Sequence, residues 1–201
     1  MIAIIDYDAG NIKSVEKALL YLGEECITTR VPDEIYKADK VILPGVGAFG
    51  DAMNKLETSG LAKVIKNVAS DNKPLLGICL GLQLMFESSD EMPGVAGLGL
   101  LKGRILAIPP KEGYKIPHMG WNSISVKAGS RLFKDIPDNS YVYFVHSYYL
   151  KAESEEDVAA STEYIVHIHA AAEHGNIFAC QFHPEKSGGT GLKILKNFCS
   201  L

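Results

Sequence analysis

Residues Pro74 to Phe86 read Pro-Leu-Leu-Gly-Ile-Cys-Leu-Gly-Leu-Gln-Leu-Met-Phe. The apolar run from Leu75 to Ile78 predicts a buried strand, and a helical pattern begins at Leu80. Between them, Gly77 to Gly81 has the form Gly-x-Cys-x-Gly, which is the nucleophile-elbow pattern with sulfur in place of oxygen. The glycines allow a sharp turn from strand to helix. We expect this turn to hold the Cys79 sulfur at a helix N-terminus, where the helix dipole favours the thiolate.

The elbow pattern by itself leaves two interpretations of Cys79 open. Cysteine is often a small buried apolar residue with no chemical role. A strand-to-helix turn flanked by glycines favours a reactive thiol instead, because that geometry exposes the side chain above a sheet. The rest of the sequence has to distinguish these interpretations.

Size and composition indicate one globular domain spanning residues 1–201. The 20 basic and 24 acidic residues give a net charge of −4 without a basic run, so neither nucleic acid nor an anionic membrane is an expected partner. The start of the chain reads as a first strand and not as a signal peptide. The four cysteines are widely spaced, which predicts a reducing cytoplasm and no metal site.

The N-terminal half alternates strands with helices. Strands are expected at Ile2–Asp6, Glu25–Val31 and Lys40–Leu43, and a helix from Asn11, as its N-cap, to Leu22. Another helix is expected over Asp51–Ser70, with an interruption near Ser59–Gly60. This spacing predicts an α/β fold with a mostly parallel, doubly wound sheet flanked by helices.

The C-terminal half has a different sequence pattern. Residues 88–97 read as a loop, and short apolar runs separated by Gly, Pro and Asn then predict additional antiparallel strands. Thr190 is the expected N-cap of a last helix. The expected strands are Gly99–Ile108, Asn122–Lys127, Tyr141–His146, Tyr148–Ala152, Val158–Thr162, Ile165–Ala172 and Ile177–Phe182.

A glycine-rich segment, Gly45 to Gly50, follows the third expected strand and matches Gly-x-Gly-x-x-Gly. A dinucleotide site also needs an acidic residue at the tip of the next strand, but Asp71 lies in a turn before that strand. No cofactor is therefore expected. The alternative use of such a segment is to present main-chain N–H groups to an oxyanion beside the elbow.

A cysteine nucleophile needs a histidine base, and six histidines compete. His167 and His169 share one face of an expected strand and read as surface or packing residues. His174 precedes Gly175 in an expected hairpin turn. His118 and His146 lie in aromatic-rich stretches and could contact a ligand.

His183 is the preferred base because it ends an apolar strand, where α/β folds place their ligands. Pro184 and Glu185 follow it. The proline favours a turn that lets Glu185 fold back onto the imidazole, hold its tautomer and stabilise the imidazolium. Cys79, His183 and Glu185 are therefore the expected catalytic triad.

Three segments together resemble the triad (class I) glutamine amidotransferases: Pro44–Gly47, Gly77–Gln83 and Phe182–Glu185. Within that family, the resemblance extends over nearly the whole chain to glutaminase subunits of imidazole glycerol phosphate synthases. Asp8 departs from the glycine common there. The further matching segments are residues 6–11, 45–53, 117–122, 143–148 and 183–187.

The resemblance implies a mechanism for glutamine hydrolysis. Cys79 would attack the side-chain amide of L-glutamine, and His183 would protonate the leaving ammonia and then activate water. The oxyanion hole would consist of the N–H groups of Leu80 and Val46. Gly45, Gly47, Gln83, His146, Ser147 and Tyr148 would bind the substrate.

The resemblance also implies a partner, a (β/α)8-barrel cyclase subunit that forms a heterodimer with this chain. The cyclase would use the ammonia to make imidazole glycerol phosphate and an aminoimidazole carboxamide ribonucleotide in histidine biosynthesis. Family resemblance suggests weak basal activity and strong activation by this partner. Interface positions implied by the resemblance are Asn11, Met119, Trp121 and Lys186.

Three other functions compete with this one. A glutaminase of anthranilate or aminodeoxychorismate synthesis would share the chemistry and differ in its partner. A cysteine peptidase or esterase would share the elbow and differ in its substrate. A dinucleotide-binding module would use Gly45 to Gly50 and no thiol chemistry.

Overall fold

In this computed structural model, which describes residues 1–8 and 11–201, a parallel sheet forms the centre of the molecule. Its strands follow the order β2-β1-β3-β4-β12, and each pairs with its neighbour in parallel. Apart from the edge strand β2, which is only partly buried, the strands are mostly apolar and buried on both faces, as parallel strands covered by helices should be. They are β1 (Ile2–Ile5), β2 (Cys26–Thr29), β3 (Lys40–Gly45), β4 (Leu75–Cys79) and β12 (Ile177–Cys180).

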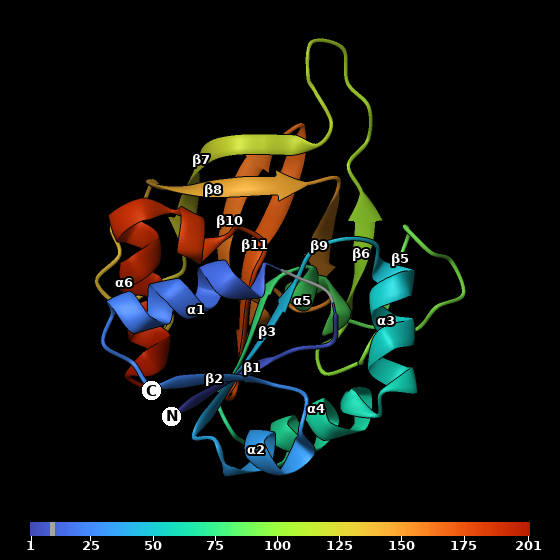
Figure 1. Cartoon of the computed structure of the whole chain (residues 1–201). Helices are drawn as coiled ribbons and strands as arrows, with labels where there is room; N and C mark the ends of the chain where they lie inside the picture. The colour runs from blue at the N-terminus through green and yellow to red at the C-terminus, as the bar shows by residue number, and fades with distance from the viewer. Residues whose placement is uncertain (9–10) are drawn as a thin grey trace.

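Helices cover both faces of this sheet (Figure 1). Side chains alternate between two cores along β1: Ile2 and Ile4 join one, and Ala3 and Ile5 join the other. The first core contains residues of α1 (Ile12–Tyr21) and α6 (Gly188–Cys199). The second contains residues of α2 (Pro32–Lys37), α3 (Phe49–Thr58), α4 (Leu61–Ser70) and the short α5 (Leu80–Leu84).

Antiparallel strands extend the sheet beyond β12, in the order β11-β10-β7-β8. A branch of shorter strands, β9, β6 and β5, pairs beside β11. The expected fold class, a mostly parallel α/β sheet with antiparallel additions in the C-terminal half, is confirmed. The bounds are β5 (Ser88–Ser89), β6 (Gly103–Ala107), β7 (His118–Val126), β8 (Ser140–His146), β9 (Tyr148–Ala152), β10 (Val158–Tyr164) and β11 (Val166–His174).

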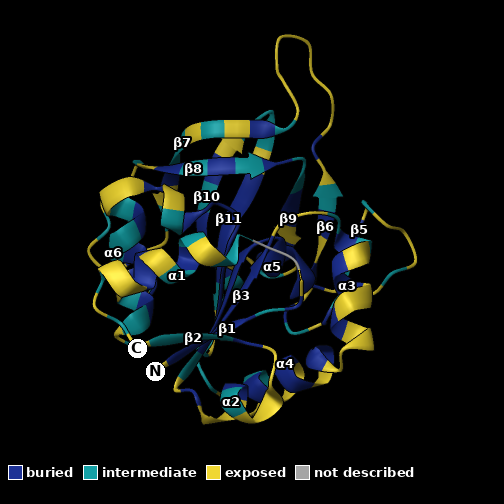
Figure 2. Ribbon diagram, in the orientation of Figure 1, coloured by how far each residue is buried: buried dark blue, intermediate teal, exposed yellow. Residues whose placement is uncertain are grey.

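The connection between β6 and β7 projects from the molecule as a long loop (Figure 1). Residues 109–116 of it are exposed, in contrast to the buried sheet below (Figure 2). The loop returns to the body at Pro117, where the strand pair β7–β8 begins. This pair crosses the upper end of the molecule (Figure 1).

Asn11 is the N-cap residue of α1, as expected, but its side chain accepts a hydrogen bond from the Ser14 hydroxyl (2.8 Å) and none from the main chain of the helix. Other local expectations were wrong. Helix α6 begins before Thr190, at Gly188, and two short elements, α2 and β5, were not expected. The break near Ser59–Gly60 is confirmed, because α3 and α4 meet there. Of the matching segment 6–11, residues 9 and 10 lie outside the described residues.

Over residues 1–8 and 11–201, each helix is too short or too polar to cross a membrane.

Candidate active site

Cys79 occupies a strained turn at the end of β4. Its backbone has φ +55° and ψ −110°, a conformation that residues other than glycine rarely adopt. The turn is possible because two glycines allow close packing around it. A Cβ at Gly81 would collide with the Leu43 carbonyl, and a Cβ at Gly77 would lie 2.7 Å from the Gly81 carbonyl oxygen. The sequence-predicted elbow is therefore present in the backbone.

The helix after the elbow is shorter than the sequence suggested. Helix α5 has 5 residues, so few peptide dipoles add up at its N-terminus. The Cys79 sulfur instead has two polar neighbours, one directly after β12 and one in β8. The Gln181 side-chain amide donates towards Sγ at 3.8 Å, and the Val145 carbonyl lies 4.0 Å away.

His183 and Glu185 form a buried pair behind the elbow. The imidazole Nδ1 lies 2.8 Å from Glu185 Oε1, and both side chains are at most 2% exposed. Nε2 is buried and has no hydrogen-bond partner within the described part of the chain, which leaves it free for the thiol or a substrate. Burial lowers the pKa of His183, but contacts with Cys79 and Glu185 outweigh burial and raise this pKa to about 9. The imidazole is therefore protonated at neutral pH.

The glycine-rich segment lies directly beside the elbow. The register of β3 and β4 pairs Gly45 with Cys79, and Val46 and Gly47 continue from there into the pocket wall. Gly47 has φ +106°, which a side chain would strain. Leu80 is the first residue of α5.

One pocket of about 370 Å³ collects most of the predicted site residues. Gly45 and Glu185 do not line it but contact residues that do, Cys79 and His183 respectively. A larger hollow of about 450 Å³, over residues 126–138, has neither cysteine nor histidine among its described lining residues. The predicted residues lining the smaller pocket are Val46, Gly47, Cys79, Leu80, Gln83, His146, Ser147, Tyr148 and His183.

The main-chain oxygen of Tyr148 organises one wall of this pocket. It accepts hydrogen bonds from His146 Nδ1 (2.8 Å) and Gln83 Nε2 (3.2 Å). Because Nδ1 of His146 donates, its Nε2 accepts, and His118 Nδ1 lies 2.9 Å from it. Asn122 Nδ2 in turn lies 3.3 Å from His118 Nε2. Burial lowers the pKa of His146 to about 3 and that of His118 to about 4, so both imidazoles are neutral.

Sequence reasoning missed several residues of the site. Glu91 lines the pocket and accepts a hydrogen bond from the Phe49 N–H (2.9 Å), at the start of α3. Pro117 and Val145 also line it. Nothing local to Glu91 predicts this position, since it lies in a loop. Gln181 had a usable signal, because it lies two residues before His183, and alternate positions in extended chain share a face.

Glu91 also bears on the dinucleotide hypothesis. Its carboxylate occupies the N-terminus of α3, where a pyrophosphate would have to bind. A second negative charge there would be repelled. Asp71 is the C-cap residue of α4 and precedes β4, so it is not at the carboxyl end of that strand.

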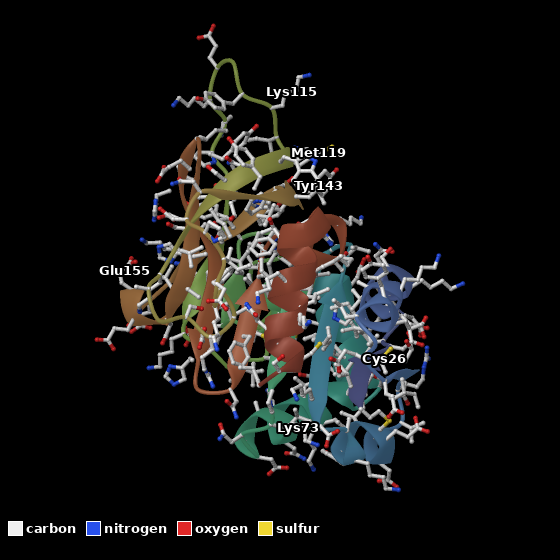
Figure 3. The ribbon with its side chains drawn as sticks, turned by 90° about the vertical axis from the view of Figure 1, so that its left-hand side faces the viewer. Cys26, Lys73, Lys115, Met119, Tyr143 and Glu155 are labelled. Carbon is white, nitrogen blue, oxygen red and sulfur yellow. The ribbon has the colours of Figure 1, made fainter. Side chains whose placement is uncertain are left out.

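The predicted interface residues lie mostly on exposed surface. Met119 and Trp121 of β7 are 61% and 55% exposed, and the Trp121 ring packs edge-on against Tyr143 at 6.1 Å. Figure 3 shows Met119 and Tyr143 together at one end of the molecule, remote from Cys26 and Lys73. Lys186 is exposed, and Asn11 is half-buried beside Val46 and Glu185.

Asp8, which departs from the pattern of the resembled family, forms an ion pair with Arg30 (2.7 Å). Hydrogen bonding to Arg30 lowers the pKa of this exposed carboxyl group. Its main-chain oxygen accepts from Lys55 (2.7 Å). Among the described residues, no group of three or more potential metal ligands is present.

A buried Cys-His-Glu arrangement beside a glycine-rich strand end, on a parallel α/β sheet, defines a thiol-dependent class of enzymes. The family description "Glutamine amidotransferase class-I" matches residues 3–200, so the chain belongs to this family. The fold agrees with solved structures. A glutamine amidotransferase superposes with TM-score 0.78 at 16% identity, covering 100% of this chain and 98% of that one. PurLQS from Thermotoga maritima superposes with TM-score 0.75 at 22% identity, with 99% and 97% coverage.

More specific relatives are imidazole glycerol phosphate synthase subunits HisH. That of Bacillus cereus (strain G9842) is 52% identical over 198 residues, covering 98% of this chain and 93% of the relative. That of Caldanaerobacter subterraneus subsp. tengcongensis is 50% identical over 198 residues, with 98% and 97% coverage. That of Moorella thermoacetica is 51% identical over 200 residues, with 100% and 94% coverage. The resemblance seen in the motifs is confirmed.

Proposed function

We propose that this chain hydrolyses L-glutamine to glutamate and ammonia, as the glutaminase subunit of an imidazole glycerol phosphate synthase in histidine biosynthesis. The observation that carries the proposal is the His183–Glu185 pair behind a strained Cys79 turn, in a chain about half identical to such subunits. The whole of residues 1–201 acts as one domain, in the cytoplasm.

The mechanism starts from a Cys79 thiolate and a His183 imidazolium. The sulfur attacks the amide carbon of glutamine, and the N–H groups of Leu80 and Val46 hold the resulting oxyanion. His183 Nε2 gives its proton to the departing nitrogen, so that ammonia leaves and a thioester remains. The neutral imidazole then takes a proton from water, the hydroxide attacks the thioester, and glutamate leaves. Glu185 keeps Nδ1 protonated throughout.

The pocket fits the amino-acid end of glutamine. Gln83, His146, Ser147 and Tyr148 line one wall, and the carboxylate of Glu91 lines it as well. A substrate ammonium group would gain an anionic partner in Glu91. Gly45 and Gly47 hold the oxyanion strand, with Gly45 opposite Cys79 in the sheet register.

The partner is a (β/α)8-barrel cyclase that forms a heterodimer with this chain and receives the ammonia. It docks on the exposed side chains of β7, where Met119 and Trp121 offer apolar surface. Asn11 and Lys186 are the other proposed interface positions. The complex makes imidazole glycerol phosphate and an aminoimidazole carboxamide ribonucleotide.

Partner binding activates the glutaminase through the oxyanion strand. A glycine at position 47 permits the peptide rotation that aims the Val46 N–H into the pocket. An oxyanion donor is worth roughly 100- to 1,000-fold in rate, so activation of this size is expected.

The test is glutamate release by the full chain, alone and with the cyclase and its nucleotide ligand. We expect roughly 100-fold or greater activation by the partner. Cys79→Ala should abolish turnover in the complex while leaving complex formation intact. Substantial turnover by Cys79→Ala, or a free chain that is already fully active, would overturn the nucleophile or the activation respectively. Copurification with a chorismate-binding subunit would point to a different pathway.

A further inference from the structure

Gln181 is a fully buried polar residue that the proposed mechanism does not use. It follows β12 directly, two residues before His183, and its side chain is 0% exposed. Its amide contacts two residues of the active site. Nε2 lies 3.8 Å from the Cys79 sulfur, and Oε1 lies 3.1 Å from Gln83 Nε2. A buried amide is kept in such a place only if its donors and acceptors are satisfied.

The surrounding groups determine which end of the Gln181 amide faces the sulfur. The Tyr148 main-chain oxygen can only accept, so the end of the Gln83 amide that faces it must be the NH₂ group. The second proton of that NH₂ group then requires an acceptor on Gln181, which places Oε1 towards Gln83. The NH₂ group of Gln181 is left facing Cys79. A single main-chain carbonyl therefore sets the direction of the whole chain of hydrogen bonds.

The donor is in a position where the thiolate needs one. Helix α5 is too short to supply a large dipole, and the Val145 carbonyl near Sγ is an acceptor, which favours the thiol. An amide N–H favours the thiolate, because hydrogen bonds to charged groups are stronger than those to neutral ones. A contact of 3.8 Å in the free enzyme is long and would tighten when the sulfur carries full charge.

We propose that Gln181 is a further catalytic residue, whose side-chain amide donates a hydrogen bond to the Cys79 sulfur and stabilises the thiolate that attacks glutamine. The proposal rests on Cys79 being the nucleophile. It also links substrate binding to the nucleophile, since Gln83 lines the pocket and holds Gln181 in the donating orientation.

The test compares two substitutions of similar size. Gln181→Met keeps the length and removes the donor. Gln181→Glu keeps an oxygen for Gln83 but turns a second oxygen towards the sulfur. The measured quantity is the pH midpoint of iodoacetamide alkylation of Cys79 in the full chain, followed on the Cys79 peptide by mass spectrometry. Thr162→Val is the matched control, because it removes a buried hydroxyl whose partner is the Ser123 carbonyl, outside the pocket.

We expect the midpoint to rise by about one pH unit in Gln181→Met, which is a tenfold shift of the thiol–thiolate equilibrium, and further in Gln181→Glu. Thr162→Val should leave it unchanged. The other titratable groups around the sulfur are the same in every variant and cancel from the comparison. They are Tyr7, Glu91, His146, Tyr148, Cys180, His183 and Glu185.

The glutaminase kcat of the complex with the cyclase provides a second readout. It should fall in both Gln181 variants, and KM should change less than kcat, because the thiolate is needed for attack and not for binding. If Gln181 had only a structural role, its substitution would lower thermal stability. The pH midpoint of Cys79 alkylation would then not be higher in Gln181→Glu than in Gln181→Met. Unchanged midpoints in folded Gln181 variants, with Cys79→Ala inactive, would overturn this inference alone. Active Cys79→Ala would overturn the proposed nucleophile first.

Discussion

The two strand regions that build the pocket differ in how they meet solvent. The elbow region, made by the ends of β3, β4 and β12, is closed on both faces, and Cys79, Gln181 and His183 are at most 7% exposed. The β7–β8 pair has one buried and one open face, and Met119 and Trp121 on it are more than half exposed. The His183–Glu185 pair lies in the closed region, where burial reduces the screening of its charges.

The two regions meet where β8 ends. His146, the last residue of β8, pairs in register with His118 of β7, and the following residues 147 and 148 turn into the pocket. The same strand pair therefore carries exposed apolar side chains outside and neutral imidazoles inside. His146 and the two residues after it therefore connect this strand pair to the pocket through the main chain. If this division is right, substitutions in the closed region should affect chemistry, and substitutions on the open face should affect association.

Glu185→Gln, in the closed region, should have the largest effect, and this effect should be on the rate of glutamine hydrolysis. The glutamine retains an oxygen for His183 Nδ1 but loses the negative charge that helps raise the His183 pKa to about 9. That pKa should therefore fall. Because the protonated imidazole donates to ammonia, the alkaline limb of kcat/KM, expected near 9 in the native complex, should move to lower pH. The rate should drop by roughly 100- to 10,000-fold.

A pH–rate profile of the complex measures both effects. Glu173→Gln is the matched control, since this mostly buried carboxylate binds Arg131 and Ser130 and does not line the pocket. It should keep the native alkaline limb. An alkaline limb that stays in place in Glu185→Gln would show that a different group titrates there, and that the closed region does not work as described.

The Cys79 turn and the His183–Glu185 pair were predictable because their signals are local. Gly77 and Gly81 indicate that the main chain packs closely against itself within one turn. His183 and Glu185 are two residues apart and follow the end of a strand. By contrast, Gln181 and Cys79 are 102 positions apart, and Glu91 reaches Phe49 across 42. No local periodicity encodes such pairs. They follow only from the order in which the strands assemble.

The open region was predicted less well, for a related reason. Strand β7 begins at His118, four residues before the expected start at Asn122. Pro117 and Gly120 resemble turn residues, and Gly120 has φ +122°, which breaks the usual strand pattern. Pairing with β8 overrides this local preference. The sequence pattern of such a half-exposed strand is therefore harder to recognise than that of a buried one.

Trp121→Ala should have an intermediate effect, and this effect should be on the affinity for the cyclase. A large exposed aromatic residue in an apolar patch is a typical binding hot spot, and its removal should weaken cyclase binding by about 30-fold, or about 2 kcal/mol. Alkylation of Cys79 in the free chain should not change. Isothermal titration calorimetry measures the affinity. Tyr21→Ala, which removes a 78% exposed aromatic residue from α1, is the control and should bind normally.

If Trp121→Ala binds the cyclase as tightly as the native chain, the β7–β8 face is not the docking surface. If Trp121→Ala weakens binding but also slows alkylation of Cys79 in the free chain, the closed and open regions are not separable. Equal weakening by Tyr21→Ala would indicate a different or much wider interface.

His118→Phe tests the boundary between the regions and should have the smallest effect. The His118 ring stacks between Phe144 (4.6 Å between centroids) and Tyr164 (4.0 Å), so phenylalanine should fit. His146 Nε2 would lose its donor, which should cost about 1 kcal/mol, the low end of the penalty for an unpaired buried acceptor, because His146 lines the pocket. The free energy of unfolding at neutral pH, from urea denaturation, should fall by that amount.

The pH dependence of this loss separates the imidazole from its shape. Burial holds the pKa of His118 at about 4, against about 6.5 in an unfolded chain, so the unfolded state binds more protons between these values. Stability is then full above pH 6.5 and declines as the pH falls towards 4. His118→Phe has no imidazole at this position and therefore loses this part of the pH dependence. The difference in free energy of unfolding between the native chain and His118→Phe should become smaller as the pH falls. A His118→Phe deficit that stays constant with pH would mean that the imidazole is not buried neutral, and that the inner side of the β7–β8 pair is open as well.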